Sequence, residues 1–286
     1  MKFSDFYQNG RPALSIEIFP PKTEKGVEVL FEELKILKTI QPVFVSVTYG
    51  AMGSTRDLTK DLALRIHREL KLKTAFHFTC VGSGRIEMKD YVTSLAREGV
   101  DLVVALRGDK PTDFEQIEDG FQFASELVAY LKTLHPFSMA VAGYPEKHIE
   151  AESFSADLEN LKRKVDAGAD IVITQLFLDN AVYYSYVEKV RQLGITAHIV
   201  PGILPIQSLK QIQRITGLCG VNLPPALLAE LESCGEDEVA MREVGVNYAI
   251  RQCRDLLQND APGIHFYSLN KSQSVLKIVE ACGDLL

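Results

Sequence analysis

One acidic residue, Glu17, lies in a short run with the pattern of a buried β-strand, residues 14–19 (LSIEIF). Side chains alternate along a strand, so Glu17 shares a face with Ser15 and Phe19, opposite the two isoleucines. An ionised carboxylate in a dry interior is costly unless it is paired or neutralised. Glu17 is therefore either an ion-pair partner, with Arg107 as the candidate cation, or a group with a chemical role.

Other polar side chains stand where further strand-like runs end. They are Ser46, Thr48, His77, Arg107, Asp109, Tyr144, His148 and Gln175. Each has an ordinary structural interpretation: His77 as a satisfied core histidine, Gln175 as a loop cap, and the Arg107–Asp109 sequence (RGD) as a paired charge. Their convergence on one end of the strands nevertheless predicts a ligand site, although it does not specify a reaction.

A second polar feature is a helical pattern within residues 156–170 (ADLENLKRKVDAGAD). Its apolar stripe consists of Leu158, Leu161 and Val165. The adjacent polar stripe consists of Asp157, Asn160 and Lys164, with Arg163 beside it. The polar stripe is either a solvated face or a groove for a phosphate and a ribose hydroxyl, and the pattern alone leaves both open.

The elements that would position these groups alternate between β-rich runs and amphipathic stretches. Strands are expected at 14–19, 43–49, 74–80, 102–106, 138–144, 171–177, 196–200 and 264–269. Helices are expected at 27–40, 57–70, 116–134, 156–167, 181–193, 208–216, 238–257 and 272–281. This α/β alternation predicts a single catalytic (β/α)8 TIM barrel domain over residues 1–286. An open doubly wound sheet is the alternative, but its usual GxGxxG motif has only a weak counterpart, VGSGRIE, with Glu87 at the third glycine, which we interpret as a loop.

Composition limits the class of protein. The 286 residues are 46% hydrophobic and 24% charged, with a net charge of −7, which disfavours a general binder of nucleic acid or of anionic membranes. The N-terminus lacks the apolar segment of a signal peptide, and no run is long enough to span a membrane. Five widely spaced cysteines without a CxxC pair indicate reduced thiols in a cytoplasmic protein, with no metal site.

Several sequence blocks resemble the bacterial type of methylenetetrahydrofolate reductase, in the order found in that family. They are FPPKT, FVSVTYGA, ALRGD, YPEKHIEA, LKRKVDAGADIVITQLF and VPGILPI. The resemblance implies an FAD-containing (β/α)8 barrel. It also implies reduction of 5,10-methylenetetrahydrofolate to 5-methyltetrahydrofolate with NADH or NADPH, which supplies methyl groups for methionine synthesis.

The resemblance implies roles for individual residues. Glu17 would be the acid that protonates the folate to form a 5-iminium cation, its pKa raised by desolvation so that a proton is available near neutral pH. Asp109 would lie near the flavin and the folate, where its charge favours the cation. Residues implied in folate binding are Thr48, Asp109, Gln175, Gln211 and Lys271.

The resemblance also implies an FAD site. Its residues are Thr48, Tyr49, Ala51, His77, Arg107, Gly108, Asp109, Ala124, Tyr144, His148, Ala151, Asp157, Asn160, Arg163 and Lys164. This assigns the polar stripe to the cofactor. Hydride would pass from the nicotinamide to flavin N5 and then to the folate, in ping-pong turnover on one flavin face.

Two residues depart from the family pattern. Lys271 stands where bacterial relatives have arginine, and Ile215 where some have an aromatic residue that packs on the substrate. The chain ends without the regulatory domain of eukaryotic members, so inhibition by S-adenosylmethionine is not expected. NADH is preferred by analogy, and an outer helix face would serve a homo-oligomer.

Two other functions compete with the reductase. A Schiff-base lyase would need a lysine inside the barrel, whereas Lys22 and Lys110 lie in loops beyond the strand ends. A non-catalytic flavin or folate binder would have no need of an acid at Glu17.

Overall fold

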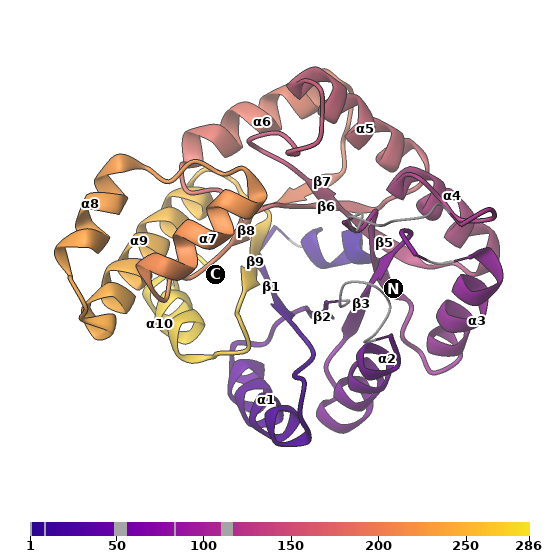
Figure 1. Ribbon diagram of the computed structural model, residues 1–286, viewed down its shortest axis with the longest axis horizontal. Coiled ribbons are helices and arrows are strands. Elements are labelled where there is room, and N and C mark those ends of the chain that lie inside the picture. Colours follow the sequence, from indigo (N-terminus) through magenta and orange to yellow (C-terminus); the bar gives the residue numbers. More distant parts are fainter. Residues whose placement is uncertain (1, 9, 49–55, 83, 110–116) are drawn as a thin grey trace.

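The computed structural model describes residues 2–8, 10–48, 56–82, 84–109 and 117–286. Its centre is a ring of parallel strands in the order β7-β6-β5-β4-β3-β2-β1-β9-β8 (Figure 1). The strands are β1 (Ala13–Ile18), β2 (Phe44–Val47), β3 (Thr74–Thr79), β4 (Leu102–Leu106), β5 (Ser138–Gly143), β6 (Ile171–Thr174), β7 (His198–Val200), β8 (Gly202–Ile203) and β9 (Gly263–Tyr267).

The predicted barrel is confirmed, with one strand position divided in two. Pro201 separates β7, which pairs with β6, from β8, which pairs with β9. Proline has no N–H to donate, so the ladder is interrupted there. The Pro201 carbonyl still accepts a hydrogen bond from the His265 N–H at 2.9 Å, which keeps the ring together at this point.

Helices surround the ring on its outside (Figure 1). They are α1 (Glu24–Leu37), α2 (Arg56–Arg65), α3 (Arg85–Ala96), α4 (Ala124–Leu134), α5 (Phe154–Asp166), α6 (Asn180–Gln192), α7 (Leu209–Cys219), α8 (Pro225–Ser233), α9 (Glu238–Gln258) and α10 (Gln273–Ala281). Short helical turns add η1 (Phe3–Tyr7), η2 (Lys38–Ile40) and η4 (Ile66–Leu70). Within the part of the chain that the structure describes, no helix is both long and apolar enough to cross a bilayer.

The helices differ from the predictions in three places. The VGSGRIE segment begins as the predicted loop, but its last three residues start α3, a helix that was not predicted; the N–H of Arg85 at its N-terminus is bound by the Asp119 carboxylate at 3.0 Å. The helix expected from residue 116 begins only at Ala124, because the Glu126 carboxylate accepts the Phe123 N–H and caps the helix there. Helix α8 was not predicted.

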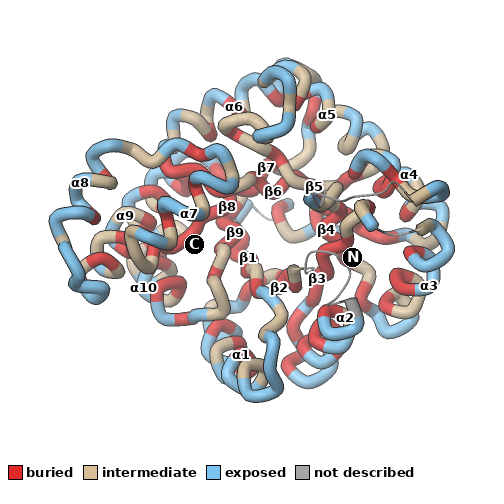
Figure 2. The backbone as a smooth tube through the Cα atoms, in the orientation of Figure 1, coloured by how far each residue is buried: buried red, intermediate tan, exposed pale blue. Residues whose placement is uncertain are grey.

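The core has separate layers inside and outside the ring (Figure 2). Ile16 and Ile18 face outward, beneath the helices. Inside, the N-terminal half is filled by small and medium apolar side chains and closed by η1, whose Phe3 is fully buried against Phe44. A third apolar cluster joins α7, α8 and α9 to the segments after β6 and β8. The C-terminal ends of the strands are therefore the end at which a site can open.

Candidate active site

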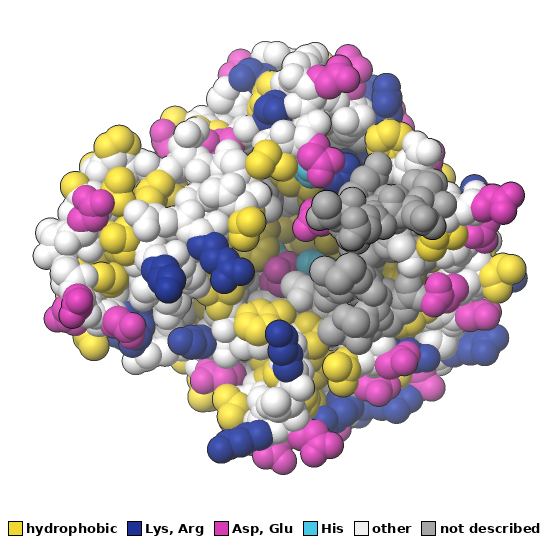
Figure 3. Space-filling model, in the orientation of Figure 1, with side chains coloured by type: hydrophobic (Ala, Val, Ile, Leu, Met, Phe, Trp, Pro, Cys, Tyr) yellow, Lys and Arg dark blue, Asp and Glu magenta, His cyan; other side chains and the backbone are white. Residues whose placement is uncertain are grey.

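Two adjoining cavities lie at the C-terminal ends of the strands. The first, which we call the mouth cavity, has a volume of about 350 Å³ and is lined by Glu17, Thr48, His77, Val104, Leu106, Ala142, Tyr144, Ile173, Gln175, Leu176, Leu204, Ile215, Cys219, Tyr267 and Leu269. The second, the side cavity, has a volume of about 200 Å³ and lies between β4, β5, α4 and α5. Leu106, Ala142 and Tyr144 line both cavities. In Figure 3 the surface is hollowed at the mouth, and acidic and histidine side chains are visible within it.

Glu17 lies between two histidines in the mouth cavity. Its Oε2 is 3.2 Å from Nε2 of His77 on β3 and 3.6 Å from Nε2 of His265 on β9. The Glu17 side chain is 21% exposed, whereas that of His265 has no exposed surface. The suggested pairing of Glu17 with Arg107 is wrong, because Arg107 forms its ion pair with Glu150.

The unliganded site does not raise the pKa of Glu17. Burial by itself would raise it, but the charge of His77 and the polar contacts with both imidazoles outweigh burial and lower the pKa to about 2. The expectation of a carboxyl protonated near neutral pH is therefore wrong for the free protein. Glu17 can therefore transfer a proton only after a neighbouring group has protonated it or a change in its surroundings has raised its pKa.

His265 and Tyr267 were not identified from the sequence. The Oγ of Ser15 lies 2.8 Å from Nδ1 of His265, and the β1–β9 register places these two residues side by side. Tyr267 follows two positions along β9 and donates its hydroxyl to the Thr174 carbonyl at 2.6 Å. The alternation of His265 and Tyr267 along one strand face is a signal that could have found them.

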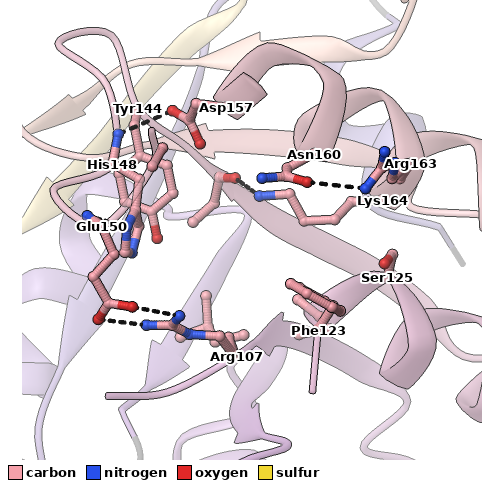
Figure 4. Close-up of a pocket in the computed structure, with 15 residues that line it drawn as sticks. Arg107, Phe123, Ser125, Tyr144, His148, Glu150, Asp157, Asn160, Arg163 and Lys164 are labelled. Atoms are coloured by element: carbon pink, nitrogen blue, oxygen red, sulfur yellow. Dashed lines mark hydrogen bonds and ion pairs between the residues drawn. The ribbon is translucent and has the colours of Figure 1, made fainter. Parts of the chain in front are cut away.

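The side cavity is cationic and partly apolar (Figure 4). Arg107, at the end of β4, forms a bidentate pair with Glu150 at 2.7 and 2.8 Å. His148 packs edge-on against the Tyr144 ring at 4.6 Å between ring centroids. The apolar wall of the side cavity includes Ala124, the first residue of α4, and the half-exposed Phe123 before it. Ala151 completes the lining near Glu150.

The polar stripe of α5 faces this cavity rather than bulk solvent. Asp157, Asn160, Arg163 and Lys164 all line it. The buried Asp157 carboxylate accepts the His148 N–H at 3.0 Å, and Nζ of Lys164 donates to the Ala142 carbonyl at 2.6 Å. Loss of solvent lowers the pKa of Lys164 to about 8, although Asp157 opposes this. The stripe therefore combines cations, an amide and a carboxylate in one groove.

These residues fit a dinucleotide such as FAD. Lys164 is a cation removed from water that donates to a neutral carbonyl, so an anionic phosphate would be a better partner. Arg163 donates to Asn160 Oδ1 at 3.4 Å. Arg163 and Arg107 both line the side cavity, which therefore holds two guanidinium groups. Small side chains at Ala105, Ala124, Ala142 and Ala151 leave a slot that a flat ring can enter.

The remaining predicted residues lie around the two cavities. Gly108 has φ +84°, and a Cβ there would come within 3.0 Å of Thr79, so the turn after β4 requires glycine. Asp109 is exposed, and its charge acts on Tyr144 and Cys219, two residues that line the mouth cavity. Thr48 lines the mouth cavity. Tyr49 and Ala51 lie outside the described residues.

Three predicted folate residues are not equally placed. Gln175 lines the mouth cavity, and its Oε1 accepts the Leu176 N–H at 2.9 Å, so it also caps a loop. Gln211 and the exposed Lys271 do not line it. Gln211 accepts the Gln207 N–H at 2.9 Å, and Gln207 in turn bonds Ser274 of α10 at 3.0 Å. The segments that carry Gln211 and Lys271 are thereby joined.

The fold and the site define an α/β barrel with a carboxylate–histidine cluster in its mouth and a cationic cavity beside it. Residues 2–283 match the family described as methylenetetrahydrofolate reductase. The 5,10-methylenetetrahydrofolate reductases of Salmonella typhimurium and Escherichia coli are 36% and 35% identical to the chain, over 96% of it and 92% of each relative. The chain therefore belongs to the methylenetetrahydrofolate reductase family.

Other relatives are longer or more distant. Methylenetetrahydrofolate reductase (NADH) 1 of Arabidopsis thaliana is 38% identical over 99% of the chain, which spans only 50% of that plant protein. A protein from Clostridium thermocellum, described as binding two copies of 5-methyl-5,6,7,8-tetrahydrofolic acid, has the same fold. Its TM-score is 0.66 at 13% identity, over 98% of both chains.

Proposed function

We propose that this protein reduces 5,10-methylenetetrahydrofolate to 5-methyltetrahydrofolate, with FAD as bound cofactor and NADH as reductant. The observation that carries the proposal is the cluster of Glu17, His77 and His265 in a cavity that adjoins a cationic one. Family membership and the names of the relatives support the reaction, and the plant names support NADH. We also propose that the protein is cytoplasmic, that it forms a homo-oligomer, and that its product supplies methyl groups for methionine synthesis.

FAD would be held in the side cavity, with its flavin reaching the mouth. Arg107, Arg163 and Lys164 would bind its phosphates, and Asp157 and Asn160 its hydroxyl groups. When bound, FAD supplies hydride transfer from the nicotinamide to the folate. The lining residues shared by the two cavities give the cofactor a continuous path between them.

Glu17, His77 and His265 would transfer the proton that the reaction requires. In the free protein the carboxylate is ionised, because the imidazoles lower its pKa. When a folate ring fills the mouth and excludes water, desolvation favours transfer of a proton from an imidazole Nε2 to the Glu17 carboxylate. The protonated Glu17 then donates to the leaving nitrogen of the bridge. That carbon–nitrogen bond breaks, and the remaining nitrogen supplies an electron pair to form the iminium.

The charge and shape of the mouth suit this intermediate. Asp109, whose charge acts on residues that line the mouth cavity, would stabilise a cation within it. Gln175 offers an amide within the cavity, and Gln211 and Lys271 would bind the folate tail beyond it. Ile215 contributes an aliphatic wall in place of an aromatic one.

The competing lyase has less support. Among the described residues that line the mouth cavity there is no lysine. Lys164 does have a lowered pKa of about 8, but it lies in the side cavity. Borohydride trapping of a substrate adduct would favour the lyase.

An anaerobic absorbance experiment tests the proposal. Purified protein loaded with FAD should be bleached by NADH, and added methylenetetrahydrofolate should restore the oxidised spectrum. If NADH bleaches the flavin but methylenetetrahydrofolate does not restore the oxidised spectrum, the protein is a flavin-containing barrel and the proposed substrate is wrong. Failure to take up FAD would overturn the assignment of the side cavity.

A further inference from the structure

Arg107 is bound within the side cavity by a carboxylate of the protein itself. Its Nη1 and Nη2 donate to the two carboxylate oxygens of Glu150 at 2.7 and 2.8 Å, and its Nε donates to the Gly108 carbonyl at 3.2 Å. A guanidinium can present an anion with the Nη1–Nη2 edge or with the edge that includes Nε. Glu150 occupies the first edge, and a main-chain carbonyl lies on the second. An anion that binds Arg107 through two hydrogen bonds must therefore displace Glu150.

The two partners of this ion pair are not equally removed from water. The Arg107 side chain is 23% exposed, whereas that of Glu150 is 50% exposed. A charged group that loses its partner is destabilised least where water can replace that partner. Glu150 can therefore leave the pair and be hydrated, whereas Arg107 needs another anion in its place. The carboxylate is the exchangeable member of the pair.

The main chain around Glu150 is held in place by the loop that follows β5. The Glu150 N–H donates to His148 Nδ1 at 3.1 Å, and the Ala151 N–H donates to the His148 carbonyl at 2.9 Å. Nζ of Lys147 donates to the Ala151 carbonyl at 2.6 Å. Figure 4 shows Glu150 extending from this loop to Arg107. A rotation of the Glu150 side chain is therefore enough to release Arg107, and the loop itself need not move.

We propose that Glu150 is an internal substitute for a phosphate of the cofactor. It neutralises Arg107 until FAD binds, and it then yields the guanidinium to the FAD diphosphate. The inference rests on the proposed function, in which Arg107 is one of the phosphate-binding cations. Phosphate oxygens accept the same paired N–H groups as a carboxylate, so one anion can replace the other. Glu150 thereby lowers the affinity of the side cavity for FAD.

Competition by Glu150 also makes the side cavity selective among anions. Inorganic phosphate that takes Arg107 exchanges one hydrogen-bonded anion for another, so its net gain in free energy is small. FAD gains in addition the contacts of its rings and of its second phosphate with the rest of the cavity, which Arg163 and Lys164 also line. A ligand with these further contacts should displace Glu150, and a simple anion should not.

The test compares Glu150→Gln with Glu152→Gln. Glu152 is a matched control because it is exposed in the same loop and does not line the side cavity, so its replacement removes the same charge nearby. Fluorescence titration measures the binding of FAD and of riboflavin, which has the flavin ring but no phosphate. In Glu150→Gln, FAD should bind about three- to tenfold more tightly, and riboflavin should bind as in the parent protein. Glu152→Gln should match the parent protein for both ligands.

Thermal stability gives a readout of the opposite sign. Before FAD is added, Glu150→Gln leaves Arg107 without its anion, so the Tm should lie below that of the parent protein. Saturating FAD should then raise the Tm by more than it does in the parent, because binding is tighter. A residue that only shaped the cavity would lower the Tm and the affinity together. Inorganic phosphate should weaken FAD binding in Glu150→Gln and have little effect on the parent protein.

The possible outcomes separate this inference from the proposed function. Unchanged or weaker FAD binding in Glu150→Gln would overturn it, as would equal tightening in Glu152→Gln. If Glu150→Gln does not fold, Glu150→Asp keeps the charge but shortens the reach to Arg107. It should also bind FAD more tightly than the parent protein, and affinity at or below the parent value would overturn the inference. A parent protein that takes up no FAD would instead overturn the assignment of the side cavity, and the inference with it.

Discussion

At the scale of the residue, partners decide what an ionisable group can do. Burial alone would make Glu17 a weak acid, and the two imidazoles reverse the direction of its pKa shift. Burial has the opposite consequence for Lys164, because its nearest acceptor is a neutral carbonyl and its pKa falls to about 8. The first group holds a charge in a cavity that would receive a cationic intermediate, and the second is a buried cation whose hydrogen-bond acceptor is a neutral carbonyl.

Replacing Glu17 with glutamine should separate the two half-reactions. Glu17→Gln keeps the size and polarity of the side chain and removes its proton transfer. FAD binding and bleaching by NADH should persist, and folate-driven reoxidation should fall by about 10²–10⁴-fold. Stopped-flow absorbance measures both, and reoxidation at the parent rate would refute the acid role.

The affinity for FAD should depend on the protonation of Lys164. A phosphate partner would raise the Lys164 pKa above its free value of about 8. The charged contact is therefore complete below about pH 8 and is lost as pH rises through the pKa of the complex. Fluorescence titration should show weaker FAD binding at alkaline pH, and Lys164→Met should flatten this dependence. An equally steep profile in that variant would assign the effect to another group.

At the scale of the element, helix α5 carries the polar side of the side cavity. Its N-terminus is fixed by the Ser153 hydroxyl, which accepts the Ala156 N–H at 3.1 Å. Its Leu158 and Leu161 are buried against the barrel, so the polar stripe is turned toward the cavity. A less stable α5 should therefore also weaken ligand binding in the side cavity.

Removal of this cap should weaken both the fold and the cofactor site. Ser153→Ala should lower the free energy of unfolding by about 1 kcal/mol and weaken FAD binding. Ser155→Ala is the matched control, because Ser155 is exposed in the first turn of the same helix. Urea unfolding and FAD titration measure the two effects, and equal stability of the two variants would contradict the capping role.

At the scale of the whole molecule, the barrel is closed at one end and open at the other. Phe3 of η1 is fully buried, packs against Phe44 at 4.9 Å between ring centroids, and has its N–H bound by Ser138 Oγ at 2.7 Å. The floor is thus a part of the core, and the mouth cavity and the side cavity both lie at the opposite end of the strands.

Truncation of this floor should destabilise the whole barrel. Phe3→Ala should lower the free energy of unfolding by about 3–5 kcal/mol, because it leaves a cavity in a closed core. Phe6→Ala, at a half-buried position of the same turn, should cost less. Urea denaturation compares the two, and equal losses would show that η1 is only loosely attached to the barrel.

Much of the fold and part of the site follow from the sequence alone. Alternation along a strand and helical spacing are local properties, so the barrel, the inward direction of Glu17 and the polar stripe of α5 could be predicted. The division at Pro201 follows from the missing proline N–H, but the strands that its two parts join are decided by pairing between distant segments. The start of α3 after Gly84 depends on Asp119, which comes from another segment.

Tertiary structure decided which groups meet. Ring closure places β1 between β2 and β9, and only this arrangement brings His265 beside Ser15 and Glu17. The direction of the Glu17 pKa shift follows from that meeting, since a pKa responds to the charges and dipoles a few ångströms away. Sequence spacing determines the face on which a side chain lies, and the packing of distant strands determines its neighbours.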